Sequence, residues 1–278
     1  MGRLEGRVAL VTGAARGIGR SVCERLAVDG ASIIATDLCG QLPGVDYATG
    51  TADDLEKTLR LVRQTGADAV GYPADVRDTA QIESVAARGL KHFGGIDIVC
   101  AAAATAAFAP MWDLSDDDWN VVIDTNLTGV FKTLRAVIPS MIERGKGGSL
   151  ILISSTAGLR GLPNNANYVA AKHGLVGLAR TLCNELGPYM IRTNTVHPTT
   201  TNTPLVHNQS SYRLFRPDLE NPTADDFAEV ATALNAMPIA WVEPMDIAAA
   251  VGWLASDESR YVTGAVLPVD AGSSQKFP

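Results

Sequence analysis

The sequence predicts a doubly wound α/β fold, with a seven-stranded, mainly parallel sheet and helices on both of its faces. Seven short runs of β-branched or aliphatic residues recur along the chain. These runs are mostly apolar rather than alternating, as expected for strands buried on both faces of a sheet. Stretches with helical spacing lie between them, and this alternation indicates βαβ units with right-handed crossovers. We therefore expect one domain over residues 1–278.

The expected elements follow in chain order. Strands are expected at residues 8–11, 32–36, 69–72, 96–100, 150–153, 191–196 and 265–269, and helices at residues 19–28, 53–64, 79–93, 115–142 and 168–186. Ser115, followed by three aspartates, is typical of a helix start, because its hydroxyl can cap the helix and the carboxylates face the positive end of the helix dipole. Residues 199–241 break the rhythm with four prolines. We expect a long irregular insertion there, and we interpret it as a substrate lid.

Composition and charge exclude several classes of protein. The 278 residues are 46% hydrophobic and 19% charged, which argues against disorder, collagen and a coiled coil. The balance of 23 Lys and Arg against 30 Asp and Glu gives a net charge of −7, so nucleic acid is not an expected partner. No apolar run approaches ~18 residues and no signal peptide is recognisable, so we expect no membrane span. The four scattered cysteines form no CxxC pair, which favours the reducing cytoplasm.

A glycine-rich turn follows the first expected strand. Gly13 permits a tight turn, and Gly17 and Gly19 let backbone N–H groups approach a pyrophosphate at the start of the next helix. Asp37 follows at the end of the second strand, at the spacing typical of a dinucleotide-binding motif. Its carboxylate can accept hydrogen bonds from a ribose and would repel a 2′-phosphate, so NAD is favoured over NADP. Arg16 beside the glycines weakly favours NADP, because its guanidinium could bind a phosphate. No cation stands next to Asp37 itself, so we let Asp37 decide.

A second motif combines a serine with a tyrosine and a lysine. Ser155 follows the fifth expected strand, and Tyr168 and Lys172 stand at positions i and i+4, which share one face of a helix. An unperturbed tyrosine has a pKa near ~10, so it can act as a base at neutral pH only where a nearby cation stabilises the phenolate. Alone, such a pair is more often a packed ring beside a solvated ammonium, but its combination with the glycine turn and with Ser155 at a strand end makes it a candidate site for proton transfer.

These motifs together resemble the short-chain dehydrogenase/reductase family, and the resemblance extends over nearly the whole chain. Besides the glycine turn, Ser155, Tyr168 and Lys172, the matching residues are Asp75 and Val76, Asn126, and the terminal Val-Asp-Ala-Gly at residues 269–272. The resemblance implies a Rossmann fold and a catalytic set of Asn126, Ser155, Tyr168 and Lys172. It implies Tyr168 as general acid or base, Ser155 as a donor to the substrate oxygen, Lys172 on the nicotinamide ribose, and Asn126 holding a relay water.

The cofactor implied by the resemblance is NAD, with Asp75 at its adenine. The residues expected to contact it are Gly13, Arg16, Gly17, Ile18, Gly19, Asp37, Leu38, Asp75, Val76, Ala102, Ala103, Tyr168, Lys172, Pro198 and Thr203. No metal is expected, since the four histidines show no ligand spacing.

The chain departs from the family pattern at two places beside the cofactor. Ala102, Ala103 and Ala104 stand where the family usually has Asn-Ala-Gly, so the packing of the cofactor there is in question. After the sixth strand the family commonly has Pro-Gly, whereas this chain has Pro198 followed by Thr199. No proton-transfer residue is lost.

An insertion at residues 39–51 lengthens the connection after Asp37. Together with the sequence Val-His-Pro-Thr at residues 196–199, it resembles the mycofactocin-associated, carveol dehydrogenase-like branch of the family. That resemblance implies that the insertion covers the adenosine end, that NAD stays bound, and that mycofactocin re-oxidises it. The alternative is an ornamental surface loop. The family also implies a homotetramer, to which the apolar helix face at residues 174–186 contributes unless that face belongs to the core.

Three functions are weighed. The favoured one is NAD-dependent interconversion of a secondary, hydrophobic and cyclic alcohol, such as a terpenoid, and its ketone. A non-catalytic NAD-binding or redox-sensing protein is the alternative that the lost Asn-Ala-Gly suggests, although such a protein needs no proton relay. Reduction of an acyl-carrier-bound ketone would require NADPH and a basic docking patch, which Asp37 and the net charge disfavour.

Overall fold

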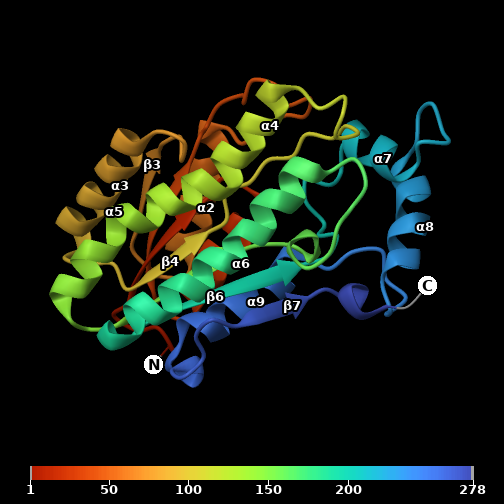
Figure 1. The fold of residues 1–278 in the computed structure, drawn as a ribbon. Helices are drawn as coiled ribbons and strands as arrows, with labels where there is room; N and C mark the ends of the chain where they lie inside the picture. The colour runs from red at the N-terminus through yellow and green to blue at the C-terminus, as the bar shows by residue number, and fades with distance from the viewer. Residues whose placement is uncertain (1, 277–278) are drawn as a thin grey trace.

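The computed structural model describes residues 2–276, and its centre is a seven-stranded sheet (Figure 1). The strands are β1 (Val8–Thr12), β2 (Ser32–Asp37), β3 (Ala69–Pro73), β4 (Ile98–Ala101), β5 (Gly148–Ile153), β6 (Ile191–Pro198) and β7 (Val266–Val269). They lie in the order β3-β2-β1-β4-β5-β6-β7, and every pairing is parallel. The doubly wound α/β fold is confirmed, and the sheet is entirely rather than mainly parallel.

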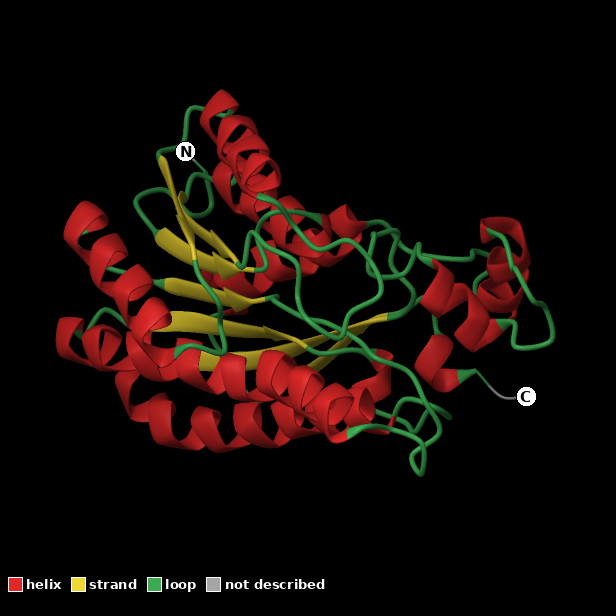
Figure 2. Ribbon diagram, turned by 90° about the horizontal axis from the view of Figure 1, so that it is seen from above, coloured by secondary structure: helices red, strands yellow, loops and turns green. Residues whose placement is uncertain are grey.

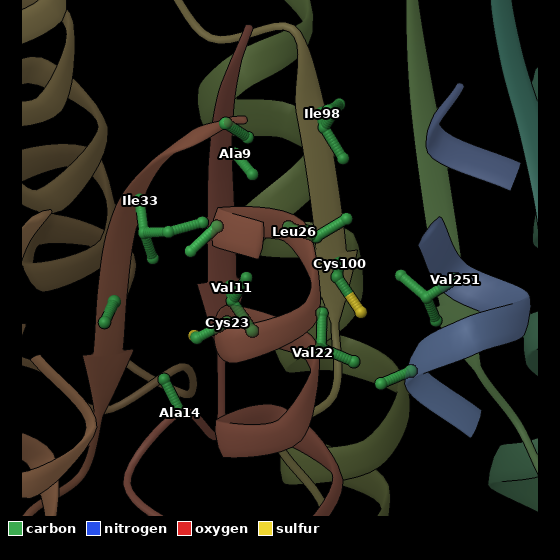
Figure 3. Close-up of a cluster of buried hydrophobic side chains, with 14 of the residues drawn as sticks. Ala9, Val11, Ala14, Val22, Cys23, Leu26, Ile33, Ile98, Cys100 and Val251 are labelled. Atoms are coloured by element: carbon green, nitrogen blue, oxygen red, sulfur yellow. The ribbon is translucent and has the colours of Figure 1, made fainter. Parts of the chain in front are cut away.

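Helices cover both faces of the sheet (Figure 2). One face carries α1 (Gly17–Val28), α2 (Ala52–Gln64) and α9 (Pro244–Ala255), and the other carries α3 (Thr79–Phe93), α5 (Gly129–Arg144) and α6 (Ala166–Leu186). Each layer buries its own apolar cluster against the sheet. Figure 3 shows the first cluster, in which Val22 and Leu26 of α1 lie near Val11 of β1, with Val251 of α9 beyond them. Because successive strand residues point to opposite faces, Leu10 of β1 joins the second cluster.

The edges of the sheet differ from the expectation of strands buried on both faces. Strands β3 and β7 are the two edge strands, and most of their residues are partly exposed. The predicted strand at residues 265–269 is therefore present, but its apolar sequence does not reflect burial on both sides. An edge strand has only one neighbour, so the helices cover it less completely.

The long helix expected at residues 115–142 is interrupted. It consists of α4 (Asp116–Ile123), a π-helical turn (Asp124–Thr128) and α5. Ser115 caps α4 as expected, because its hydroxyl accepts a hydrogen bond from the N–H of Asp118 at 3.0 Å. The π-turn contains Asn126, and such single turns inside α-helices often occur at functional sites.

The segment at residues 199–241 is not irregular throughout, so that expectation was wrong. It contains α7 (Gln209–Phe215) and α8 (Ala224–Leu234), which lie beyond the carboxyl ends of the strands, away from the main layers (Figure 1). Each has a side-chain N-cap, from Asn208 and Thr223. Phe227 of α8 is fully buried among other aromatic rings of the segment. The prolines stand in the connections rather than in the helices, so local helix formation was not prevented.

In the part of the chain that the structure describes, short 3₁₀ turns also occur at Thr156–Gly158, Gly187–Tyr189, Asp257–Ser259 and Ser273–Gln275. All four cysteines are free. Within residues 2–276 no helix is both long enough and apolar enough to cross a membrane.

Candidate active site

A cleft opens where the strand order reverses between β1 and β4. Connections leave these neighbouring strands in opposite directions, so a crevice forms at their carboxyl ends, where parallel α/β sheets bind ligands. The cleft measures about 190 Å³. All the residues expected to contact NAD line it: Gly13, Arg16, Gly17, Ile18, Gly19, Asp37, Leu38, Asp75, Val76, Ala102, Ala103, Tyr168, Lys172, Pro198 and Thr203.

The glycine turn forms the floor of the cleft between β1 and α1. Gly13 has a φ of +66°, and a Cβ there would lie 2.7 Å from the Cα of Ala103. Only glycine fits this combination of backbone conformation and close approach. Gly17, with a φ of +54°, begins α1, and the methyl group of Thr203 lies against it. The start of α1, with Gly17 and Gly19, lines the cleft, and a helix N-terminus is where a phosphate can bind.

The carboxylate of Asp37 is held at the end of β2 by backbone N–H groups. Its two oxygens accept hydrogen bonds from Ala15 N at 2.9 Å and from Cys39 N at 3.3 Å. Arg16 also lines the cleft, but its guanidinium donates to the carbonyl of Ala48 at 2.6 Å and lies 6.0 Å from the ring of Tyr47. Arg16 is thus held by the insertion instead of standing free for a 2′-phosphate.

The insertion at residues 39–51 packs over the cleft and is no ornamental loop. Leu42, Val45 and Tyr47 are buried in a third apolar cluster, together with Val121 and Val122 of α4. Figure 1 shows α4 and the segment at residues 199–241 on the same side of the molecule, beyond the ends of the strands. The insertion reaches further than the adenosine end. The Tyr47 hydroxyl lies 3.0 Å from Thr105 Oγ1 and 3.3 Å from the N–H of Ala106, which donates to it.

The loop after β4 is held without the usual asparagine and glycine. Thr12 Oγ1 accepts hydrogen bonds from Ala102 N at 3.1 Å and from Ala103 N at 3.2 Å. Asn126 lies outside the cleft lining, and its side chain forms two bonds of 2.8 Å with the backbone N–H and C=O of Thr105. The alanines therefore leave the loop ordered, and the sequence did not indicate that Asn126 anchors it.

Ser155, Tyr168 and Lys172 meet at the inner end of the cleft. β5 ends just before Ser155, and α6 carries the other two residues on one face. Lys172 Nζ donates to the carbonyl of Ile153 at 2.8 Å and lies 5.3 Å from the centre of the Tyr168 ring. Burial lowers the pKa of Lys172 to about 7. Burial also raises the pKa of Tyr168 to about 12, although the neighbouring Ser155 hydroxyl acts in the opposite direction.

Two neighbouring residues position this group, and the sequence pattern did not reveal them. His197 is fully buried, with Nδ1 2.7 Å from the carbonyl oxygen of Ser155 and Nε2 2.8 Å from Thr195 Oγ1. Burial lowers the pKa of His197, which favours the neutral ring. The Oδ1 of Asn167 accepts from the N–H of Tyr168 at 2.7 Å. Among residues 2–276 no group of three or more metal-ligating side chains is placed to hold an ion.

A second cavity, of about 130 Å³, adjoins the first. Ser155 and Tyr168 line both cavities. The segment at residues 199–241 contributes half of the residues that line the second cavity, and most of these are apolar: Leu205, Val206, Leu214, Phe215, Phe227 and Leu234. Ser155 and Tyr168 therefore stand where the glycine-lined cleft meets the second cavity.

A dinucleotide-binding fold with a serine, a tyrosine and a lysine at this position defines a class of oxidoreductases, and the chain belongs to the short-chain dehydrogenase/reductase family. A family model described as enoyl-(acyl carrier protein) reductase matches residues 13–274. A (-)-trans-carveol dehydrogenase of Rhodococcus erythropolis is 45% identical over 277 residues, covering 99% of this chain and 100% of that protein.

Solved structures agree with this assignment. Carveol dehydrogenase from Mycobacterium avium in complex with NAD is 46% identical, with a TM-score of 0.97, covering 99% of this chain and 100% of that one. A short chain dehydrogenase from Mycobacterium paratuberculosis bound to NAD is 42% identical, with a TM-score of 0.90 and the same coverage.

Proposed function

We propose that the protein is an NAD-dependent oxidoreductase that interconverts a secondary alcohol and its ketone, with a hydrophobic, cyclic and terpenoid-like substrate. The observation that carries the proposal is the position of Ser155 and Tyr168 between the two cavities. The solved relatives that contain NAD and the similarity to carveol dehydrogenase support it. The non-catalytic alternative is disfavoured because a protein that only binds NAD does not need the proton-transfer set of Asn126, Ser155, Tyr168 and Lys172.

The residues of the cleft fit NAD. Gly13, Gly17 and Gly19 line it at the turn into α1, where helix N–H groups can receive a phosphate, and Asp37 and Asp75 line it at the end remote from Tyr168. Asp37 would hold a ribose, Asp75 would lie at the adenine, and Lys172 and Thr203 would hold the nicotinamide half. When bound, NAD supplies the acceptor for the hydride of the alcohol carbon.

Tyr168 and Ser155 perform the proton chemistry in this proposal. The Ser155 hydroxyl holds the substrate oxygen, and Tyr168 Oη takes the hydroxyl proton as the alcohol is oxidised or returns it on reduction. The pKa of about 12 in the cofactor-free site leaves Tyr168 protonated at neutral pH. A cationic Lys172, helped by a cationic nicotinamide ring, lowers that pKa and makes the phenolate accessible. Asn126 fixes the backbone of Thr105 through its two hydrogen bonds. We propose that it also holds the relay water.

A screen of secondary alcohols tests the proposal. Purified protein with added NAD and an artificial electron acceptor is incubated with cyclic terpenoid, acyclic and acyl-thioester substrates, and products are identified by mass spectrometry. We expect ketones from the cyclic alcohols, with residues 199–241 acting as a lid over the second cavity. Bound NAD without oxidation of any alcohol would support a redox-sensing protein instead.

We expect Asp37→Ala to reduce the preference for NAD over NADP by about 10-fold or more, because it removes a charged hydrogen-bond acceptor and the repulsion of a 2′-phosphate. The measurement is the ratio of the two dissociation constants on protein stripped of cofactor with charcoal. Asp53→Ala is the control, since it removes the same charge from an exposed position at the start of α2. An unchanged ratio in the Asp37 variant would place the ribose elsewhere.

We also expect NAD to remain with the purified protein and to be re-oxidised in place, with mycofactocin as the proposed carrier. The insertion supports this, because Tyr47 and Leu42 cover the cleft and a covering segment acts mainly on the dissociation rate. The protein is purified without added cofactor and denatured, and NAD is assayed in the supernatant. A small fraction of one equivalent per chain, together with ready turnover of free NAD, would contradict the expectation.

The proposed assembly is a homotetramer. The apolar face at residues 174–186 no longer supports it, because Leu175, Val176, Ala179, Leu182 and Leu186 are buried inside the chain. The remaining support is family membership and the exposed Trp119 of α4 and Phe131 of α5. Light scattering at micromolar concentration is expected to show about four times the 29.2 kDa of the chain. A monomer would reject the assembly.

A further inference from the structure

The insertion at residues 39–51 reaches the wall of the second cavity through one side chain. Tyr47 is buried and lines the first cavity. Its hydroxyl lies 3.0 Å from Thr105 Oγ1 and accepts a hydrogen bond of 3.3 Å from the N–H of Ala106. Thr105 lines the first cavity, and Ala106 lines the second. The Tyr47 hydroxyl is therefore bonded to a segment that passes from the cofactor cleft to the cavity beneath the proposed lid.

The backbone of this segment depends on side chains for its hydrogen bonds. Residues 102–108 form neither helix nor strand. Asn126 bonds both backbone groups of Thr105, whereas Tyr47 contacts the Thr105 hydroxyl and bonds the N–H of Ala106. Thr105 and Ala106 are both buried, and a buried N–H that loses its partner is costly. We therefore expect the segment to loosen when the Tyr47 hydroxyl is removed.

The ring and the hydroxyl of Tyr47 have separate contacts. The ring is buried in the third apolar cluster with Leu42 and Val45, and the partly buried Tyr168 and Leu205 pack against that cluster. Leu205 lines both cavities, so the cluster joins the insertion to the proton-transfer residue and to the proposed lid. A phenylalanine at position 47 would supply the same packing and would still cover the cleft. Only the hydroxyl bonds the segment after β4.

We propose that Tyr47 is a positioning residue of the substrate site, whose hydroxyl fixes the Thr105–Ala106 wall against which the alcohol lies. This inference rests on the proposed function and gives the insertion a second role beside covering NAD. A fixed wall costs little ordering entropy when a ring binds, whereas a loose wall has to be ordered by the substrate. The effect falls on binding of the alcohol more than on the chemical step, because Ser155, Tyr168 and Lys172 are all retained.

Tyr47→Phe tests the inference, because it keeps the ring and removes the hydroxyl. On the NAD-loaded protein, we expect amide hydrogen exchange in residues 102–109, measured by mass spectrometry, to become about 10-fold faster, since one hydrogen bond of ordinary strength is lost. Menthol is the cyclic alcohol used as probe, with an artificial electron acceptor. Its KM is expected to rise about 10-fold while kcat stays nearly unchanged, as the loss of uniform binding requires.

Two further variants assign the effect to this contact. Thr105→Val removes the other hydroxyl at nearly constant size, and the double variant is expected to behave like Tyr47→Phe alone, because both changes act on one contact. Tyr261→Phe deletes the same hydroxyl from a tyrosine that is 81% exposed, and it should change neither the exchange nor the KM.

The outcomes separate this inference from the proposed function. Unchanged exchange in residues 102–109 overturns it. Faster dissociation of NAD from Tyr47→Phe with an unaltered KM for menthol also overturns it, because Tyr47 would then only cover the cofactor. If the wild type does not oxidise menthol, the proposed substrate class fails, while the exchange measurement still decides whether Tyr47 fixes the wall. If Tyr47→Phe does not fold, Thr105→Val decides the inference by the same two measurements.

Discussion

Replacement of Tyr168 by phenylalanine is expected to lower kcat by about 10²–10⁴-fold, the range over which general acid–base catalysis contributes. The substitution removes the proton-transfer oxygen and keeps the ring that packs against the third apolar cluster. Alcohol oxidation with an artificial acceptor provides the rate, and NAD content per chain is measured alongside it.

Two comparisons test whether the loss of kcat in Tyr168→Phe comes from the missing proton-transfer oxygen. NAD content is expected to match the wild type, because the ring that lines the cleft is retained. Tyr189→Phe deletes the same hydroxyl from a tyrosine that is 45% exposed and far from the cleft lining, and its kcat is expected to be unchanged. A Tyr168→Phe protein with near-normal turnover would remove Tyr168 from the proposed mechanism.

Replacement of Lys172 by methionine is expected to change activity and stability in opposite directions. Activity falls by at least about 10²-fold, since the cation that stabilises the Tyr168 phenolate is lost. Stability of the cofactor-free protein rises at neutral pH, because the wild type carries a buried ammonium whose pKa is lowered to about 7. At about 1.4 kcal/mol per pKa unit the gain is a few kcal/mol, of which about 1 kcal/mol is offset by the lost bond to Ile153.

The pH dependence provides the test of that explanation. In the unfolded chain Lys172 has a pKa near ~10.4. The free-energy cost of burying its charge therefore has its full value below pH ~7 and disappears as the pH rises towards ~10.4. The difference in Tm between the variant and the wild type should therefore be largest at or below neutral pH and should shrink through this window. Lys146→Met, at an exposed position, is the control and should show no such trend. A Tm difference that is independent of pH would contradict the assigned cause.

Much of the fold and the cleft was predictable because the signals are local. Strand and helix periodicity depends on residues a few positions apart, and all the predicted strands are present with ends shifted by one or two residues. The glycine turn needs a backbone conformation that its own sequence allows. Tyr168 and Lys172 are four residues apart, and that spacing alone places them on one face of a helix. The interruption at Asn126 was missed because a π-turn has no distinct sequence period.

By itself, the sequence determined the class of fold, the glycine-lined cleft and the identity of the residues that meet there. Only the tertiary structure decided how the insertion packs against α4, and that the ring of His197 is bonded to the Ser155 carbonyl. These features depend on contacts between segments far apart in the chain, such as Tyr47 with Thr105. Hydrogen bonding and burial at such contacts are set by the packing of the whole molecule, because no local pattern specifies which distant group a side chain will meet.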